Sequence, residues 1–185
     1  MPRLKEKYKK EVIPAMREKF GYGNDMAVPK IEKVVVNTGF GRLVADKTKD
    51  EQAKIHDSIL QDLAAICGQK PILRKSKKSI AAFKTREGME IGASCTLRKK
   101  RMYDLLERLI DIALPRTRDF QGIDQKAVDR QGNLTVGIKE HSVFPEILPE
   151  KMKAVFGLEI TAVTNAKNGE EGLELFKLMG FPIKK

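Results

Sequence analysis

The clearest strand pattern in the chain is the stretch Met89-Glu90-Ile91-Gly92-Ala93-Ser94-Cys95-Thr96-Leu97. Apolar residues alternate with polar or small ones, which predicts a strand with one face on a core. Apart from Glu90, the other face carries only small residues, Gly92, Ser94 and Thr96. Such a face would let a bulky partner come close to the backbone, although small residues can also simply face solvent. The stretch predicts one core-facing strand and leaves the use of its second face open.

This strand lies in the most basic window of the chain. Residues 70–101 contain eleven Lys or Arg and two Glu, a formal charge of +9 in a chain whose total is +11. Basic runs stand near the two ends of the window, Arg74-Lys75-Ser76-Lys77-Lys78 and Arg98-Lys99-Lys100-Arg101. Such a density of like charge needs full solvation or a polyanionic partner. Because the window is also predicted to be ordered, we favour a nucleic-acid-binding face over a merely solvated one.

Length and composition indicate a single domain that covers residues 1–185. The chain is 41% hydrophobic and 33% charged, as in a globular protein with a basic excess. It has no run of 18 apolar residues for a membrane span, and residues 1–7 lack the apolar region of a secretory signal. Cys67 and Cys95 have no zinc or disulfide spacing, so we expect buried thiols in a reducing cytoplasm.

The remaining segments alternate irregularly between helix and strand patterns. Strands are predicted at residues 30–37, 134–138 and 158–164, and residues 79–83 can return as a strand after the basic run. Helices are predicted at residues 4–20 with a kink or break at Pro14, at 50–67, at 101–114, and from Asn168 to near Met179. Asn168 and Glu171 have the spacing of a capping box. Together these segments predict an α+β fold, a mostly antiparallel sheet with helices packed on one face.

No motif has the spacing of a catalytic or metal site. Gly39-Phe40-Gly41 follows a strand, but Val44 stands where a dinucleotide loop needs its third glycine. His56 is expected on a helix surface and His141 in a loop, each without a partner group. We therefore expect a protein that is not an enzyme and has no metal or cofactor.

Short motifs in a fixed order give a more specific indication. They occupy residues 33–41, 68–71, 77–84, 86–88, 96–98, 114–120, 144–146 and 180–182. Their order and spacing resemble the large-subunit ribosomal protein family conventionally numbered five, in its bacterial form, over nearly the whole chain. One departure is Lys99-Lys100 after Arg98, where many members of the family have a glycine.

The resemblance implies a structural, ribosome-bound protein of the cytoplasm. The family binds 5S rRNA, helps to attach it to the large-subunit rRNA in the central protuberance, and lies among neighbouring large-subunit proteins. A loop between strands reaches the P-site tRNA, and another surface forms a bridge to a small-subunit head protein. The family fold is an antiparallel sheet with helices on one side.

The predicted RNA-binding face comes mainly from residues 30–42 and 69–101. Its cations would neutralise phosphates, its amides would reach bases or ribose hydroxyls, and its glycines would permit close backbone approach. Asn37 can equally cap the turn at the end of its strand. The rRNA-binding set is Lys30, Lys33, Asn37, Gly39, Gly41, Gln69, Lys70, Arg86, Gly92, Arg98, Lys99 and Arg101.

Two further sets follow from the family. The tRNA-contacting loop would use Arg74, Lys75, Ser76, Lys77, Lys78, Ser79 and Phe83, and the alternative is that this loop merely extends the 5S site. The subunit bridge would use Arg116, Arg118, Asp119, His141, Phe144 and Glu146, since contacts that move suit modest polar surfaces.

Two rival classes of function can be discriminated. A DNA-binding regulator needs a recognition helix with basic and amide side chains, whereas the basic window here has strand and loop patterns. An enzyme acting on an anionic substrate needs a pocket with clustered, perturbed titratable groups.

Overall fold

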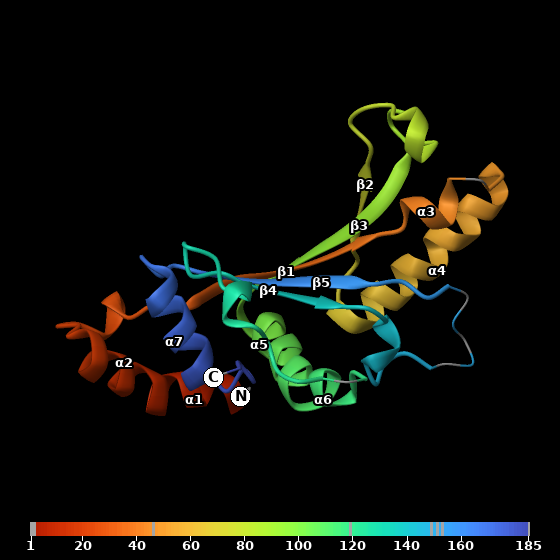
Figure 1. Ribbon diagram of the computed structural model, residues 1–185. Helices are drawn as coiled ribbons and strands as arrows, with labels where there is room; N and C mark the ends of the chain where they lie inside the picture. The colour runs from red at the N-terminus through yellow and green to blue at the C-terminus, as the bar shows by residue number, and fades with distance from the viewer. Residues whose placement is uncertain are drawn as a thin grey trace. The chain divides into compact units, whose positions relative to one another are not determined.

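The computed structural model describes residues 3–45, 47–118, 120–148, 150, 152 and 154–184. Five strands form one antiparallel sheet in the order β2-β3-β1-β5-β4 (Figure 1). They are β1 (Ile31–Gly39), β2 (Ile72–Lys75), β3 (Glu90–Leu97), β4 (Leu134–Ile138) and β5 (Leu158–Thr164). The predicted α+β class with an antiparallel sheet is confirmed.

The helices are separated by short helical turns of other types. They are α1 (Arg3–Lys7), α2 (Ile13–Phe20), α3 (Gly41–Val44), α4 (Lys49–Cys67), α5 (Lys99–Arg108), α6 (Leu114–Arg116) and α7 (Gly169–Met179). Single 3-10 turns are η2 (Asp25–Ala27), η3 (Ala81–Phe83), η5 (Gln125–Ala127) and η6 (His141–Val143). Residues 79–83 were predicted to return as a strand; they form η3 instead, preceded by a single β-bridge between Ile80 and Thr85.

Two prolines explain two π-helical turns. The turn η1 (Tyr8–Val12) joins α1 to α2 just before Pro14, and η4 (Leu109–Ala113) joins α5 to α6 just before Pro115. A proline ring inside a helix crowds the carbonyl four residues earlier and removes one N–H donor. In both places the wider turn closes with an i to i−5 bond, Ile13 N–H to Tyr8 O and Leu114 N–H to Leu109 O. At Pro14 the expected break into two separate helices does not occur, because the helical path continues through a π-turn into α2.

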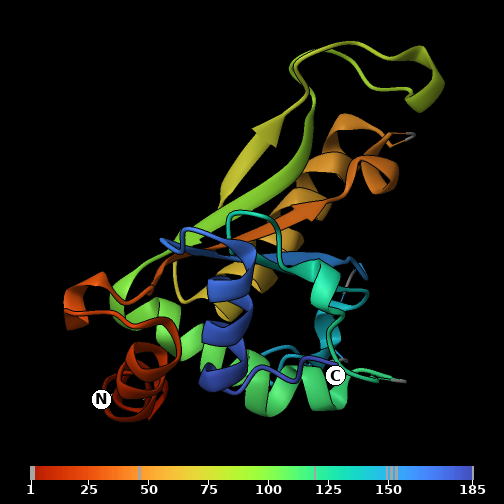
Figure 2. The same ribbon diagram turned by 60° about the vertical axis from the view of Figure 1, so that its left-hand side comes forward.

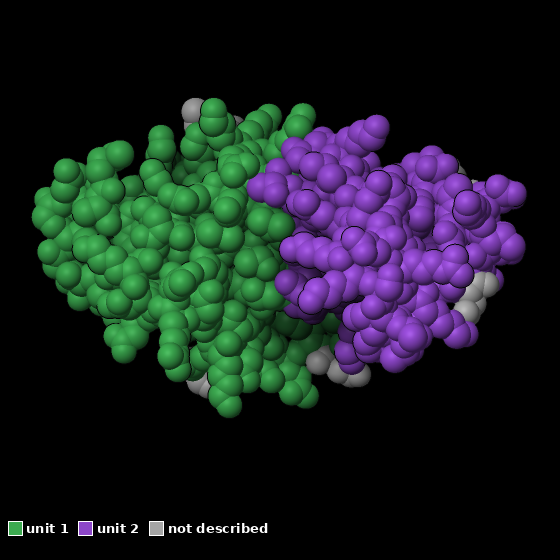
Figure 3. Space-filling model, turned by 90° about the horizontal axis from the view of Figure 1, so that it is seen from above, with its two compact units in different colours: residues 1–35, 97–136, 160–185 green, residues 36–96, 137–159 purple. Residues whose placement is uncertain are grey.

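By their contacts the residues divide into two compact units (Figure 3), which are described separately. Unit 1 comprises residues 1–35, 97–136 and 160–185. Its core includes the side chains on the inner face of α5 and η4, which are all buried: Met102, Leu105, Leu106, Leu109 and Ala113. Phe176 of α7 meets Phe181 edge to face with ring centres 5.1 Å apart.

The start of α7 is built differently from the prediction. The Asn168 side chain makes no capping hydrogen bond, while the Glu171 carboxylate accepts from the Lys167 N–H at 3.0 Å. Glycines explain the difference, since a Cβ on Gly172 would lie 2.4 Å from the Gly132 Cα and a Cβ on Gly169 would lie 2.9 Å from the Asp129 carbonyl oxygen. The helix end is thus held against the 129–134 turn by backbone contact rather than by a complete capping box.

Unit 2 comprises residues 36–96 and 137–159. Its longest helix, α4, buries Ile59, Leu63 and Ile66. It ends at Cys67 as predicted, and Gly68 follows in the left-handed region. The capping box that the sequence analysis sought in α7 occurs here instead: the Glu51 N–H bonds the Thr48 hydroxyl, and the Glu51 carboxylate accepts from the Thr48 N–H at 3.0 Å.

A protruding hairpin end is the second feature of unit 2. Residues 76–89, which we call the finger, connect β2 to β3 and project beyond the sheet in two views (Figures 1 and 2). Backbone bonds between Ser76 and Met89 and between Gly88 and Ser76 close its base. None of its side chains is buried. The finger is therefore an ordered extension that its own unit does not cover.

Candidate nucleic-acid interface

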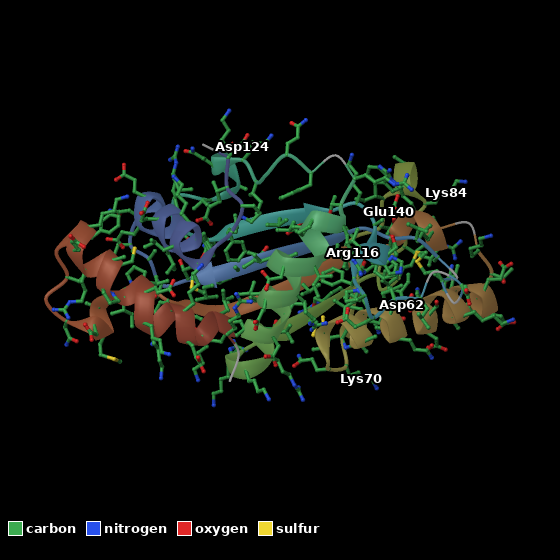
Figure 4. All side chains as sticks on the ribbon, turned by 90° about the horizontal axis from the view of Figure 1, so that it is seen from below. Asp62, Lys70, Lys84, Arg116, Asp124 and Glu140 are labelled. Atoms are coloured by element: carbon green, nitrogen blue, oxygen red, sulfur yellow. The ribbon has the colours of Figure 1, made fainter. Side chains whose placement is uncertain are left out.

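In unit 2 the predicted cations lie on the surface. Lys70 is in the turn that follows α4 (Figure 4), while Lys75, Lys77, Lys78 and Arg86 lie on or next to the finger, and all five are exposed. Within the described part of the chain, none of these five ammonium or guanidinium groups pairs with a carboxylate. Their charge is available to an external anion.

The small face of β3 serves the sheet itself. A Cβ on Gly92 would lie 2.8 Å from the Thr38 carbonyl oxygen of β1, and Ser94 accepts a hydrogen bond from the Arg74 guanidinium at 2.7 Å. Gly92 and Ser94 are both buried. This corrects the idea that the small residues make room for a partner, because the neighbouring strands already occupy that space.

In unit 1 the predicted cations lie on β1 and at the start of α5. Lys30, Arg98, Lys99 and Arg101 are exposed and Lys33 is half-buried. Lys99 has a φ of +54°, in the left-handed region that glycine adopts without strain. The departure noted in the sequence, lysine where a glycine was expected, therefore falls on a residue whose backbone favours glycine.

The amides and the remaining glycines have different roles. The Gln69 amide donates to the Thr96 carbonyl at 2.9 Å, so it ties the turn after α4 to β3. Asn37 is half-buried, and its side chain has no hydrogen-bond partner among the described residues, so the turn-capping alternative gains no support. A Cβ on Gly41 would lie at an ordinary 3.5 Å from the Ile91 side chain, whereas a Cβ on Gly39 would meet nothing within 4 Å. The fold itself does not require glycine at position 39.

The residues predicted for a subunit bridge do not all reach the surface. Arg116 and Arg118 are exposed and Glu146 is half-buried. His141 and Phe144 are fully buried, which corrects the expectation that their side chains meet a partner. Asp119 lies outside the described residues.

His141 is part of an interior pair that the sequence analysis missed. Its Nε2 lies 3.5 Å from Oδ2 of Asp62 on α4 (Figure 4), and its ring stacks on Phe156 at 3.9 Å between centres. Burial lowers the pKa of the His141 ring and raises the pKa of the Asp62 carboxyl, and the attraction between the two groups partly offsets both shifts. No sequence spacing signals this pair, since its members are brought together only by the fold.

His56 is also not the surface residue that was predicted. Its side chain is 12% exposed, packs against Phe40 at 5.3 Å between ring centres, and lies 3.4 Å from Glu90 through Nδ1. Across the described segments, no group of three or more His, Cys, Asp or Glu side chains is arranged to hold a metal ion. Each histidine instead packs on an aromatic ring and faces one carboxylate, which is a structural arrangement.

Comparison with known proteins matches nearly the whole sequence to one family. A family model described as ribosomal protein L5 matches residues 24–86, and a second, described as the C-terminus of the same ribosomal family, matches residues 90–183. The chain belongs to the ribosomal protein L5 family. The two L5 family models meet between Arg86 and Glu90, at the end of the finger.

Full-length L5 relatives agree. The chain is 52% identical over 185 residues to the large ribosomal subunit protein uL5 of Desulforamulus reducens, covering 100% of this chain and 99% of that protein. It is 51% identical over 180 residues to uL5 of Halothermothrix orenii, covering 97% of each. L5 proteins are structural and non-enzymatic, and this chain is a ribosome-bound structural constituent of the large subunit. None of the helices that the structure describes is long and apolar enough to cross a membrane.

Proposed function

We propose that this L5 protein binds 5S rRNA and helps to attach it to the large rRNA in the central protuberance, in the cytoplasm and beside neighbouring large-subunit proteins. A phosphate contact made by an exposed cation releases condensed counterions, which favours binding to any polyanion. Membership of a ribosomal family makes folded RNA the polyanion. The observation that carries the proposal is a set of exposed cations without carboxylate partners among the described residues: Lys70, Lys75, Lys77, Lys78 and Arg86 in unit 2, and Lys30, Arg98 and Lys99 in unit 1.

The exposed side of β1 fits an RNA helix better than a base-reading surface. Lys33 and Asn37 are half-buried on the side of the strand opposite the buried Val34 and Val36. Helical RNA offers a wide, shallow minor groove lined by ribose hydroxyls, which short polar side chains on a strand can reach. Lys33 would pair with phosphates and Asn37 with hydroxyls or base edges.

The finger is the proposed contact to P-site tRNA. Its side chains are unburied and it carries Lys77, Lys78, Lys84 and Arg86, so it presents charge at a distance from the rest of its unit. The other assignment, an extension of the 5S site, predicts that finger variants weaken 5S binding. The tRNA assignment predicts that they leave it unchanged and weaken tRNA crosslinking on the ribosome.

The bridge to a small-subunit head protein is proposed for exposed polar groups only. Arg116 and Arg118, both in unit 1, lie at the end of α6 and just after it, and both are exposed. Glu146 is half-buried and is left out of the proposed surface. Contacts that are broken and remade suit such solvated groups, because few apolar atoms need to be covered each time.

The test is binding of the full chain to 5S rRNA across a range of salt concentrations. We expect Lys33→Ala and Arg98→Ala to lower affinity and to make the slope of log affinity against log salt shallower by about one for each lost phosphate contact. Lys126→Ala is the matched control, since Lys126 is on η5 and outside the proposed set. Equal affinities and slopes for all three variants would contradict the assignment of Lys33 and Arg98 to the rRNA-binding surface. Stronger binding to duplex DNA than to 5S rRNA at matched salt would favour a DNA-binding regulator.

A further inference from the structure

Exposed apolar side chains gather around one hollow of unit 2. Leu43, Ile80, Phe83 and Val155 are all large and exposed, Phe83 to 68% and Ile80 to 46%, and all four line this hollow. We call it the apolar hollow. At about 930 Å³ it lies within the range of small-molecule sites, roughly 300–1,000 Å³. A water-exposed apolar surface of this kind indicates a site that is covered in the working state.

A second concavity lies across the wall formed by Lys84 and Thr85. It is lined by Lys47, Lys49, Lys84 and Arg86, with Glu87 as the carboxylate among the described lining residues, and we call it the basic groove. Ala45, Lys84 and Thr85 line both concavities, so an occupant of one is next to the other.

The charges of the two concavities select an anionic occupant with one apolar, flat part. The described lining of the apolar hollow contains two cations, Arg42 and Lys84, and no carboxylate. The N-terminus of α4 beside the basic groove is already satisfied by the Thr48–Glu51 capping box, so side-chain cations have to hold an anion there. A nucleotide combines these properties, because a base has an apolar face and its phosphates are charged.

The finger holds Phe83 on a firm support. Lys84 follows it with a φ of +50°, its N–H bonds the Ala81 carbonyl at 3.0 Å, and the Ile80–Thr85 bridge closes the turn. Figure 4 labels Lys84 on the finger, and Figure 2 shows the finger extended beyond α3. Because the backbone that carries Phe83 is already held by these bonds, little backbone entropy is lost when a base stacks on the ring.

We infer that the apolar hollow takes one unpaired RNA base, stacked on Phe83, while the basic groove takes the adjoining phosphates. The inference rests on the proposed RNA-binding function and adds to it a separate site that recognises unpaired RNA. Base stacking on aromatic side chains tolerates any sequence. This site therefore discriminates single-stranded from helical RNA, which the β1 surface is not built to do.

The experiment uses the full chain and a decauridylate RNA that carries one 5-iodouridine, a base that crosslinks under ultraviolet light to an aromatic ring in contact with it. We expect a crosslink on Phe83, retained in Phe83→Tyr and absent in Phe83→Ala. Phe83→Ala should also weaken binding of unmodified decauridylate roughly 5- to 150-fold, the range for one stacked base, with an unchanged salt slope. Lys47→Ala should instead make the slope shallower.

Ile72→Ala is the matched control, because Ile72 is 63% exposed and does not line the hollow. A crosslink elsewhere, or equal binding by Phe83→Ala and Ile72→Ala, would overturn the inference and would point to an apolar protein segment as the occupant. 5S rRNA binding by the same wild-type preparation separates this failure from failure of the proposed function. If the wild type binds 5S rRNA and Phe83→Ala has no effect on decauridylate binding, only the proposed base site in the hollow is ruled out.

Discussion

Two regions of the chain differ most in how closely they are packed. One is the contact between α7 and the 129–134 turn in unit 1, and the other is the finger in unit 2. In the first, Gly132 and Gly172 touch through their backbones, and the buried Thr164 hydroxyl donates to the Gly132 carbonyl at 2.7 Å. In the finger, no side chain from 76 to 89 is buried and the tip carries exposed Ile80 and Phe83.

This contrast separates two reasons why a position carries a particular amino acid, namely packing within the chain and binding to a partner. At the α7 contact each small residue is required by a neighbour in the same chain. In the finger no side chain is buried, so the packing of its own unit does not fix the residue types there. The same distinction divides the glycines that the sequence analysis assigned to RNA, since Gly92 is required by β1 whereas Gly39 has open space beside it.

The largest expected effect comes from Gly172→Ala. In an ordinary helix this change stabilises by up to about 1 kcal/mol. Here the new Cβ would lie 2.4 to 2.8 Å from three backbone atoms of Gly132, so we expect the free energy of unfolding to fall by roughly 3 kcal/mol, as in overpacked cores. Urea denaturation followed by circular dichroism measures it. Gly39→Ala is the control. An equal loss of stability in that variant would contradict the idea that only Gly172 is required by its neighbours.

The next effect tests whether unit 2 also contains residues fixed by their own fold. Burial holds the pKa of His141 below its usual 6.5, so the unfolded chain takes up the proton first as pH falls. The free energy of unfolding should therefore decrease below about pH 6.5, by at most about 1.4 kcal/mol per pH unit for one proton.

The groups facing His141 bear on the sign of this pH effect. Asp62 on α4 has a raised pKa, so its contribution to the pH dependence has the opposite sign, and the nearby negative charge of Glu140 raises the pKa of His141 and so reduces the effect. Urea midpoints between pH 7.5 and 5.5 should fall in the wild type and stay nearly flat in His141→Gln. A variant that keeps the full wild-type slope would assign the effect to another group.

Local patterns predicted the elements well, because their causes are local. The alternation in residues 134–138 and 158–164 matches the bounds of β4 and β5, and α4 ends at Cys67 as expected. The predictions that were wrong or missing concern features that depend on contacts between residues far apart in the sequence. The His141–Asp62 pair, the burial of Phe144 and the role of Gly92 all come from neighbours far away in sequence, which periodicity does not reveal.

The candidate site was predictable only as charge. A count of lysines and arginines located the basic window, yet it did not separate Arg74, which bonds Ser94, from Lys77 and Lys78, which project from the finger. The apolar hollow was missed because the described residues that line it come from four separate segments, near positions 43, 80, 91 and 155. Their exposure has no signature in the sequence.

A smaller effect is expected at the helix that borders the basic groove. Thr48→Ala removes the side chain that accepts from the Glu51 N–H and should lower the free energy of unfolding by about 1 kcal/mol. Asn168→Ala is the matched control at α7, where the side chain makes no capping bond, and it should change stability much less. Urea denaturation of both variants tests this, and equal losses would show that the cap of α4 is no stronger than that of α7.

The smallest effect on stability is expected at Lys99, which lies neither in the α7 contact nor in the finger. A φ of +54° strains any residue with a Cβ by roughly 1–2 kcal/mol, and glycine would relieve that strain while losing part of the gain to backbone entropy. We expect Lys99→Gly to raise the free energy of unfolding by up to about 1 kcal/mol, whereas Lys100→Gly, the same change one residue along α5, should lower it by about as much. Urea denaturation of the two variants measures both changes.

The same Lys99→Gly variant should bind 5S rRNA more weakly, with a salt slope shallower by about one. Opposite signs for stability and affinity would mean that a strained lysine is retained for its charge, so that its identity is set by a partner, as we propose for the finger. If Lys99→Gly stabilises the fold and leaves the affinity and slope unchanged, the lysine has no role in RNA binding.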